Sequence, residues 1–316
     1  MTPKPAPKTR PAVNPRHSRP PAEPPPQVSG TWLLRALVIS LVTAGVCAYL
    51  TLCLLFYQGQ WQIVFHPSRT ITSTPATVGL RFDEVRFDAT ESGQLQLDGW
   101  WIPADPASRY ANSTLLFFHD GKGSLSDSVD ELKTLHALGI NLFAFDYRGF
   151  GLSQNTHPSE ERIYQDADAA WNYLIDTRHL NPRTIVLYGK ELGATIAAEI
   201  AVRHSSLPAL ILEDPAPTGL ALIKSDPRTK LLPLRLLFHD RLELEPKLRD
   251  LKTPKLFLSV QTDSIDIPSI ERTKAAYRSA AEPKEYFDLN TGFAGEGLPH
   301  YQESLRRFLD EHLTAP

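Results

Sequence analysis

A glutamate stands at the centre of a turn framed by two glycines, in the segment GKELG at residues 189–193. The apolar run TIVLYG leads into this segment and the alanine-rich run ELGATIAAEIA follows from Glu191, which predicts a strand, a sharp turn and a helix. A carboxylate at such a turn can act as a nucleophile, because it need not lose a proton before it attacks. It can also simply stabilise the helix start, where the macrodipole favours negative charge. A catalytic and a structural interpretation of Glu191 are therefore both open.

Four further carboxylates follow predicted strands and are expected at the same edge of the fold: Asp120, Asp214, Asp263 and Asp266. Clusters of oxygen ligands can hold Ca²⁺ or Mg²⁺. However, no EF-hand-like spacing is present, and three cations close in sequence can neutralise the same charge: Lys122, Arg148 and Lys190. We therefore expect no metal ion and no cofactor.

Short apolar runs alternate with helical patterns along most of the chain. The predicted strands are 80–89, 94–102, 113–118, 140–145, 184–189, 209–213, 255–260 and 284–289, and the predicted helices include 126–139, 161–180 and 191–204. The first two strands alternate apolar and polar residues, as half-exposed antiparallel strands do, whereas the later ones are continuously apolar, as in buried parallel strands. This alternation predicts an α/β protein with a doubly wound sheet, whose ligands bind beyond the carboxyl ends of the strands.

The strand ends, taken in order, resemble those of the α/β-hydrolase superfamily. The segments that carry the resemblance are LLFFHDGKGS, DYRGFGLS at residues 146–153 with the proline-acid helix start after it, TIVLYGKELGA and TPKLFLSVQTDSIDIP. The resemblance spans about residues 60–313 and is closest to membrane-anchored serine hydrolases, like the serine aminopeptidases and prolyl oligopeptidases. It implies an α/β-hydrolase fold, with a mostly parallel central sheet, helices on both faces and a minimal cap between the predicted strands 209–213 and 255–260.

The resemblance also implies a catalytic serine in G-x-S-x-G, an acid after a later strand and a histidine near the C-terminus. Glu191 occupies the serine position. The acid position, counted back from Pro268, is Ser264, and Asp263 stands one residue early. The turn TGFAGEG, where the histidine belongs, has none, and His300 comes a few residues later.

The oxyanion hole of this superfamily uses two backbone N–H groups, one after the nucleophile and one in the loop after the third strand. By resemblance these positions are Leu192 and Gly121. The Glu191 carboxylate, at a helix start and beside such donors, is expected to fold back on them and fill the site.

The chain departs from the family pattern at the nucleophile, acid and histidine positions. We therefore expect the serine mechanism to be absent, and a non-catalytic protein is the favoured interpretation. The alternative is a hydrolase that uses Glu191 as nucleophile, as haloalkane dehalogenases and epoxide hydrolases of the superfamily use aspartate, with His300 activating the water. A serine enzyme using Ser124 or Ser264 instead has no motif to support it. If a ligand binds, the resemblance implies a small ester or a peptide.

A membrane span is predicted at Ala36–Tyr57, where 22 residues carry no charge. At 1.5 Å per residue such a helix crosses a hydrocarbon core of about 30 Å, and Trp32 and Tyr57 stand where interfacial aromatics are expected. No A-x-A cleavage site follows, which favours an uncleaved signal-anchor over a signal peptide. The two cysteines of the chain both fall in this run, so disulfides and cysteine-ligated metals are excluded in the remainder.

Six Lys or Arg residues precede the span, while Arg69 is the sole one in the 18 residues after it. The positive-inside rule then places the N-terminus in the cytoplasm and the remainder outside, in the periplasm if the source is bacterial. The predicted organisation is a disordered proline-rich basic tail at 1–31, the span at 32–57, a juxtamembrane segment at 58–78 and the α/β domain at 79–316. The net charge of −3 gives no basic footprint for nucleic acid.

Overall fold

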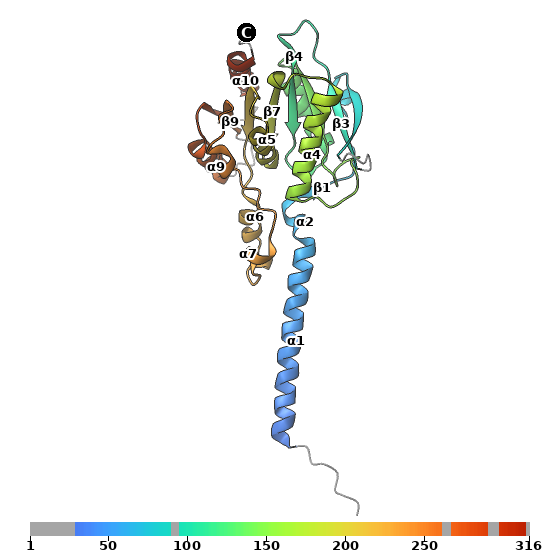
Figure 1. Cartoon of the computed structure of the whole chain (residues 1–316), viewed down its shortest axis with the longest axis vertical. Coiled ribbons are helices and arrows are strands. Elements are labelled where there is room, and N and C mark those ends of the chain that lie inside the picture. Colours follow the sequence, from blue (N-terminus) through green and yellow to red (C-terminus); the bar gives the residue numbers. More distant parts are fainter. Residues whose placement is uncertain (1–28, 90–94, 261–266, 290–296, 314–316) are drawn as a thin grey trace, which may run out of the picture. The chain divides into compact units, whose positions relative to one another are not determined.

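The computed structural model describes residues 29–89, 95–260, 267–289 and 297–313. The chain forms two compact units, residues 1–52 and 53–316. The boundary falls within one long helix, α1, Gly30–Gly59 (Figure 1). The mean hydropathy of an 18-residue window of α1 is 2.3, so by length and composition this helix is able to cross a membrane. The predicted span 36–57 lies inside it, and the four predicted boundaries stay predictions.

The second unit is built on an eight-stranded sheet with the order β10-β9-β8-β7-β4-β6-β3-β2. Its strands are β2 Asp83–Asp88, β3 Gln96–Ile102, β4 Tyr110–Phe118, β6 Ile140–Phe145, β7 Ile185–Lys190, β8 Ala209–Glu213, β9 Lys255–Val260 and β10 Lys284–Leu289. Pairing is parallel from β10 through β6, whereas β3 is antiparallel to both β6 and β2. All eight strands fall on the predicted runs. β2 alternates exposed and buried residues as expected, whereas β3 is buried at six of its seven positions, so the expectation that it is half-exposed was wrong. The predicted α/β-hydrolase fold is confirmed.

Helices cover both faces of this sheet (Figure 1). The α-helices of the second unit, beyond α1, are α2 Trp61–Val64, α3 Val129–His136, α4 Glu160–Asn172, α5 Leu192–Arg203, α6 Gly219–Ser225, α7 Leu234–Leu237, α8 Glu245–Leu248, α9 Ile267–Ser279 and α10 Gly297–Leu313. Short 3₁₀ turns lie at Pro75–Val78, Leu125–Ser128, Pro182–Thr184 and Pro227–Thr229, and a π-helical turn at Tyr173–Thr177 extends α4.

The central strand β4 shows how a continuously apolar run supplies both faces. Leu116 and Phe118 belong to the core beneath α4 and α5, whereas Leu115 and Phe117 belong to the core beneath α3 and α10. All four side chains are fully buried. Because successive side chains of a strand point to opposite faces, two packed helical layers require apolar residues at every position.

The segment after α1 is attached to the loop that follows β4. Here β1, His66–Pro67, pairs in parallel with β5, Lys122–Gly123. The His66 N–H donates to the Gly121 carbonyl at 3.1 Å and the Ser68 N–H to the Gly123 carbonyl at 2.6 Å. Phe65, just before β1, is buried in the core at 1% exposure. Residues 65–68 are thus part of the wall of the domain at the carboxyl end of β4.

Candidate active site

The turn between β7 and α5 holds Glu191 in a backbone conformation that side-chain-bearing residues rarely adopt. Its φ is 47° and its ψ is −109°. Such strained conformations gather at functional sites, where the surrounding structure enforces them. Two glycines make the turn possible. A Cβ on Gly189 would lie 2.2 Å from the Gly193 carbonyl oxygen, and one on Gly193 would lie 2.0 Å from the Phe118 carbonyl oxygen.

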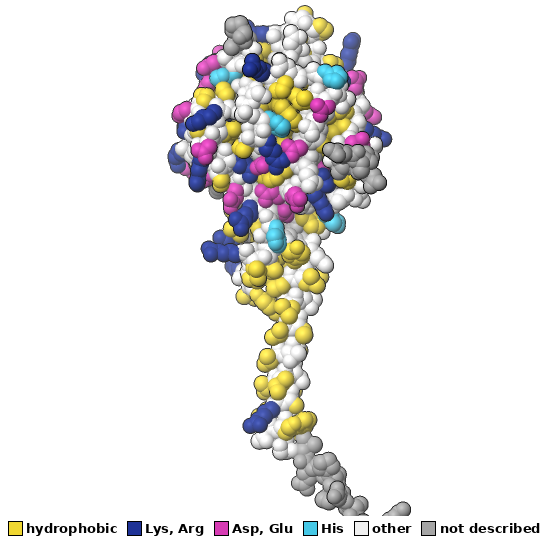
Figure 2. Space-filling model, in the orientation of Figure 1, with side chains coloured by type: hydrophobic (Ala, Val, Ile, Leu, Met, Phe, Trp, Pro, Cys, Tyr) yellow, Lys and Arg dark blue, Asp and Glu magenta, His cyan; other side chains and the backbone are white. Residues whose placement is uncertain are grey.

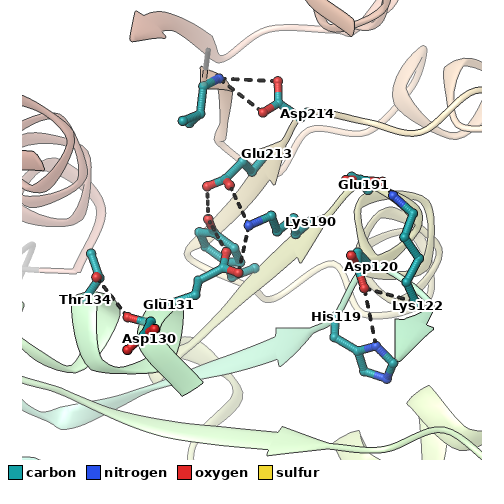
Figure 3. Close-up of polar contacts among 12 residues, drawn as sticks. His119, Asp120, Lys122, Asp130, Glu131, Thr134, Lys190, Glu191, Glu213 and Asp214 are labelled. Atoms are coloured by element: carbon teal, nitrogen blue, oxygen red, sulfur yellow. Dashed lines mark hydrogen bonds and ion pairs between the residues drawn. The ribbon is translucent and has the colours of Figure 1, made fainter. Parts of the chain in front are cut away.

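The Glu191 carboxylate forms a hydrogen-bonded ion pair with the Lys122 ammonium (Figure 3). The two side chains are 33% and 55% exposed, respectively. The backbone N–H of Glu191 donates to the Glu213 carbonyl at 2.8 Å, which fixes the turn to the end of β8. The carboxylate was expected to fold back onto the oxyanion-hole N–H groups. Its recorded partner is instead an ammonium, because Lys122 follows Gly121 in the facing loop and offers a full positive charge.

The two predicted oxyanion-hole positions, Gly121 and Leu192, lie against each other. Gly121 has a φ of 76°, and a Cβ there would be 2.3 Å from Leu192 Cδ2. The Gly121 N–H donates to His119 Nδ1 at 3.3 Å. Leu192 is the first residue of α5, whose backbone N–H has no acceptor within the helix. The loop after β4 and the turn after β7 therefore come together as the resemblance implies.

A buried polar cluster, which the sequence did not reveal, lies next to this turn. Lys190 Nζ is 2.9 Å from Glu131 Oε2 and 3.4 Å from Glu213 Oε1 (Figure 3). The hydroxyls of Tyr188 and Tyr301 both donate to Glu213 Oε2, the latter at 2.8 Å. The Glu213 side chain is 2% exposed, so this network compensates a fully buried charge.

The charges of the cluster shift one another's titration. Burial raises the pKa of Glu131 to about 7, and the neighbouring charge of Glu213 adds to the rise. Burial acts to lower the pKa of Lys190, but the charges of Glu213 and Glu131 outweigh it and raise that pKa. Burial and the Glu213 charge raise the pKa of Tyr188 and Tyr301 well above the usual range. Both tyrosines therefore stay protonated and donate.

Asp214, directly after β8, is a second titratable group at this edge of the sheet. Its carboxylate accepts hydrogen bonds from the Val260 N–H at 3.2 and 3.3 Å and from the Ser269 hydroxyl at 3.4 Å. Burial raises its pKa to about 7, with the charges of Glu213 and Glu191 acting in the same direction. Asp214 thus lies within electrostatic range of the Glu191 carboxylate.

The free energy of unfolding of Asp214→Asn, relative to wild type, is expected to be higher at pH 8 than at pH 5. A folded-state pKa raised from 3.8 to about 7 adds stability at low pH that is lost as the pH rises through 7. The asparagine variant lacks this loss, so its free energy of unfolding relative to wild type should rise by roughly 1–2 kcal/mol between the two pH values. Urea titrations at both pH values measure this. If the difference in free energy of unfolding between variant and wild type stayed constant or fell from pH 5 to pH 8, the raised pKa of Asp214 would be contradicted.

The other predicted site residues divide into three groups. Asp263, Ser264 and Asp266, the residues at and around the family's acid position, lie outside the described residues. His300 lies in the first turn of α10 with an exposed side chain, and its proposed role as base stays a prediction. Of the cations expected near the carboxylates, Arg148 pairs instead with the fully buried Asp166, and Lys190 with the cluster just described.

The carboxylates near the turn offer little to a metal ion in the part of the chain that the structure describes. Glu191 is paired with Lys122, and Asp214 accepts backbone and hydroxyl hydrogen bonds. Elsewhere, Glu285, Glu311 and His312 have ligand atoms within 4.8 Å of one another. Arg307 already binds the Glu285 carboxylate at 2.9 Å, so a cation there would compete with a guanidinium.

A model of the serine aminopeptidase family, S33, matches residues 111–284, more than half of the chain. The chain belongs to this family. The matched range contains β4 from its second residue with the loop that follows it, the turn at Glu191 and the end of β8, which are the parts that form the candidate site. It ends before α10, so His300 lies outside the portion that the serine aminopeptidase model covers.

Individual relatives agree with this membership. An uncharacterized protein of Mycobacterium tuberculosis, Rv2307c, is 30% identical over 251 residues, covering 79% of this chain and 83% of its own. The human α/β hydrolase domain-containing protein 17C is 34% identical over 146 residues, which is 46% of this chain and 43% of the human protein. A solved esterase of Pyrococcus furiosus, Pf2001, superposes with a TM-score of 0.58 at 18% identity, covering 79% of this chain and 98% of its own, and shows the shared fold.

Proposed function

We propose that this chain is a serine aminopeptidase-family protein that has lost the serine mechanism and is held at a membrane by α1, with its α/β domain on the extracytoplasmic side. One observation carries the loss of mechanism. Glu191 stands in the strained turn where the family's nucleophile stands, and its carboxylate is tied to Lys122 from the loop that supplies the second oxyanion-hole position.

The small contribution of this ion pair to stability supports a role in the site rather than in folding. A partly exposed pair contributes only about 0.2–1 kcal/mol to stability. Its effect on chemistry is larger, because a side chain that is held by an ammonium lies where a substrate carbonyl would have to approach. The pair therefore closes the site to acyl transfer by a serine enzyme's route and leaves a charged surface that can bind a ligand.

The second candidate is a hydrolase with Glu191 as nucleophile. Two observations favour it: the carboxylate is 33% exposed, and Asp214, with a pKa of about 7, lies within its electrostatic range. Glu191 would attack an electrophilic carbon and displace its leaving group as an anion, which forms an alkyl ester. Water, activated by Asp214 or His300, would then add to the Glu191 carbonyl, release the substrate carbon as an alcohol and regenerate the carboxylate. Glutamate is one methylene longer than aspartate, and misplacement by about 1 Å can cost 100-fold in rate. Pairing with Lys122 further weakens the carboxylate as a nucleophile, so the non-catalytic function is supported better.

A fluorophosphonate probe, which needs an activated serine, is expected to leave the full chain unlabelled. Glu191→Ser should give only faint turnover of an activated ester, since serine needs a positioned base, and an oxyanion hole with binding alone supplies roughly 10³–10⁴-fold over water. Glu191→Gln, which keeps the side chain's shape and removes its charge, is the matched control and should give none. The measurements are gel fluorescence and ester hydrolysis in detergent.

Two results would overturn the non-catalytic function. The first is stoichiometric labelling of any serine in the wild-type chain. The second is incorporation of heavy oxygen from labelled water into the Glu191 side chain during turnover, seen by mass spectrometry of the peptide, which would establish the carboxylate nucleophile. Combining Glu191→Ser with histidine at Gly295, the position implied by the family's turn, should raise turnover above that of Glu191→Ser alone.

The anchor makes a separate prediction. The full chain should stay in the membrane pellet after carbonate washing, because α1 buries an apolar surface that carbonate cannot release. A reporter that requires export should be active when fused after Pro316, and one that requires the cytoplasm should not. Recovery of a shortened soluble chain beginning near residue 58 would show a cleaved signal instead.

A further inference from the structure

The segment between β8 and β9 carries an exposed apolar surface. Leu231, in the turn between the 3₁₀ element Pro227–Thr229 and α7, is 81% exposed, and Leu236 of α7 is 76% exposed. Within the described residues these are the most exposed large hydrophobic side chains outside α1. Contiguous apolar exposure of this kind marks interaction sites in soluble domains. We name residues 219–237 the cap.

The cap also carries a local excess of positive charge. Four exposed basic residues lie in it: Lys224, Arg228, Lys230 and Arg235. Its one acidic residue, Asp226, is bound to Arg228 at 2.5 Å. The net charge of the whole chain is −3, so the excess of positive charge is local. Figure 2 shows hydrophobic side chains gathered over the region of α6 and α7, with Lys and Arg at its margin.

The cap lies beside the end of α1 within the same compact unit, residues 53–316. The Gln60 side chain donates one hydrogen bond to the Leu237 carbonyl at 3.2 Å and another to the Tyr57 carbonyl at 2.9 Å. The Tyr57 and His239 rings meet edge to face with centroids 5.4 Å apart. The residues at and just after the end of the predicted span therefore contact the residues at and just after the end of the cap.

The exposed leucines stand on a fixed base. The Thr229 hydroxyl donates to the Ile223 carbonyl at 2.8 Å, and both residues are buried. Gly219 packs so closely that a Cβ there would lie 2.0 Å from the Asp240 carbonyl oxygen. The cap is thus held in place while Leu231 and Leu236 face outward. Exposing these side chains to water is unfavourable, and burying them against another apolar surface is favourable.

We propose that the cap docks on the headgroup layer of the bilayer that α1 spans, with Leu231 and Leu236 inserted at the acyl boundary and Lys224, Lys230 and Arg235 on anionic lipid phosphates. The inference rests on the proposed membrane anchor. Its chemistry is that of interfacial amphipathic segments, which combine leucines with basic residues. The contacts between the cap and the end of α1 place the cap near the membrane surface, because α1 would leave the bilayer at that point. Lipid is the expected occupant because the positive charge of the cap complements anionic headgroups and the cap adjoins the end of α1.

The test uses the full chain reconstituted in liposomes of phosphatidylcholine with or without phosphatidylglycerol. An environment-sensitive fluorophore is placed on cysteine at Leu236, in a background with Cys47 and Cys53 replaced by serine, and quenching by bromine-labelled lipid is measured. Val202, also exposed at 50% but on α5, provides the control position. Quenching at position 236 should exceed that at 202 several-fold. Neutralising Lys230 or Arg235 with glutamine should lower the docked-to-undocked ratio roughly fivefold each in the anionic liposomes.

Each outcome separates the cap from the anchor. If the chain resists carbonate but position 236 is no more quenched than position 202, the anchor stands and cap docking is overturned. If carbonate releases the chain from the liposomes, the anchor and the docking proposal both fall. If position 236 is shielded from water but not quenched by lipid, and chemical crosslinking there joins two copies, the cap is a protein interface and the lipid proposal is wrong.

Discussion

Gly193→Ala is expected to destabilise the α/β domain by about 3 kcal/mol or more, or to prevent its folding. The methyl group would lie 2.0 Å from the Phe118 carbonyl oxygen and 2.8 Å from that of His119. Phe118 ends β4, the central strand, and is paired with Gly189 of β7, so its carbonyl cannot move without disturbing that pairing. The measurement is the free energy of unfolding in urea, followed by tryptophan fluorescence in detergent.

Gly59→Ala is the matched control, because a Cβ there meets nothing within 4 Å. Its effect should stay within about 0.5 kcal/mol. If Gly193→Ala were as mild as this control, the close approach of the turn to β4 would be wrong. The reconstruction of the site around Glu191 would then fail with it.

Lys190→Met should cost about 3 kcal/mol at pH 8, the low end for a buried ion pair because the Lys190 side chain is 29% exposed, since its removal leaves two carboxylates uncompensated. The variant would leave Glu131 and Glu213, whose side chains are 15% and 2% exposed, facing each other without a cation. The pKa of Glu131 is already about 7, and stability linked to a raised carboxyl pKa is lost as the pH rises through that value. The cost should therefore shrink at pH 5, where Glu131 takes up a proton.

Two further variants sharpen this experiment. Adding Glu131→Gln and Glu213→Gln to Lys190→Met should recover most of the loss, since the glutamine at position 213 still accepts from Tyr188 and Tyr301. Lys122→Met is the control, because its pair with Glu191 is partly exposed and should be worth no more than about 1 kcal/mol. Equal losses for the two lysine variants would mean that burial does not distinguish the pairs.

The sequence pattern was sufficient to predict the sheet and the turn at Glu191, because both depend on local composition. A strand buried on both faces reads as a continuous apolar run, and glycines at 189 and 193 are needed wherever a strand turns sharply into a helix. The pairing of Glu191 with Lys122 was not predictable in the same way. It depends on how the loop after β4 is shaped, and several cations near in sequence were equally plausible partners.

The buried cluster needed tertiary information of another kind. Lys190 and Glu213 end neighbouring strands and are partners in the β7–β8 register. Their position at two strand ends is the one feature of the cluster that the sequence contains. Glu131 arrives from α3 and Tyr301 from α10, on one face of the sheet. Helix positions of this kind follow from packing, so no spacing in the sequence indicates that the four residues meet.

The pairing of β1 with β5 has a mechanical consequence. The chain that leaves α1 reaches the Gly121 carbonyl within a few residues and is hydrogen-bonded to the loop beside Glu191. If α1 is a membrane anchor as proposed, a pull on it from bilayer thinning or lateral tension would load those hydrogen bonds before the strands of the eight-stranded sheet. Cutting the chain after Ser68 would release the same loop from its tether. A soluble fragment that lacks β1 is thus not a neutral substitute for the whole protein, because its site would have lost one of its walls.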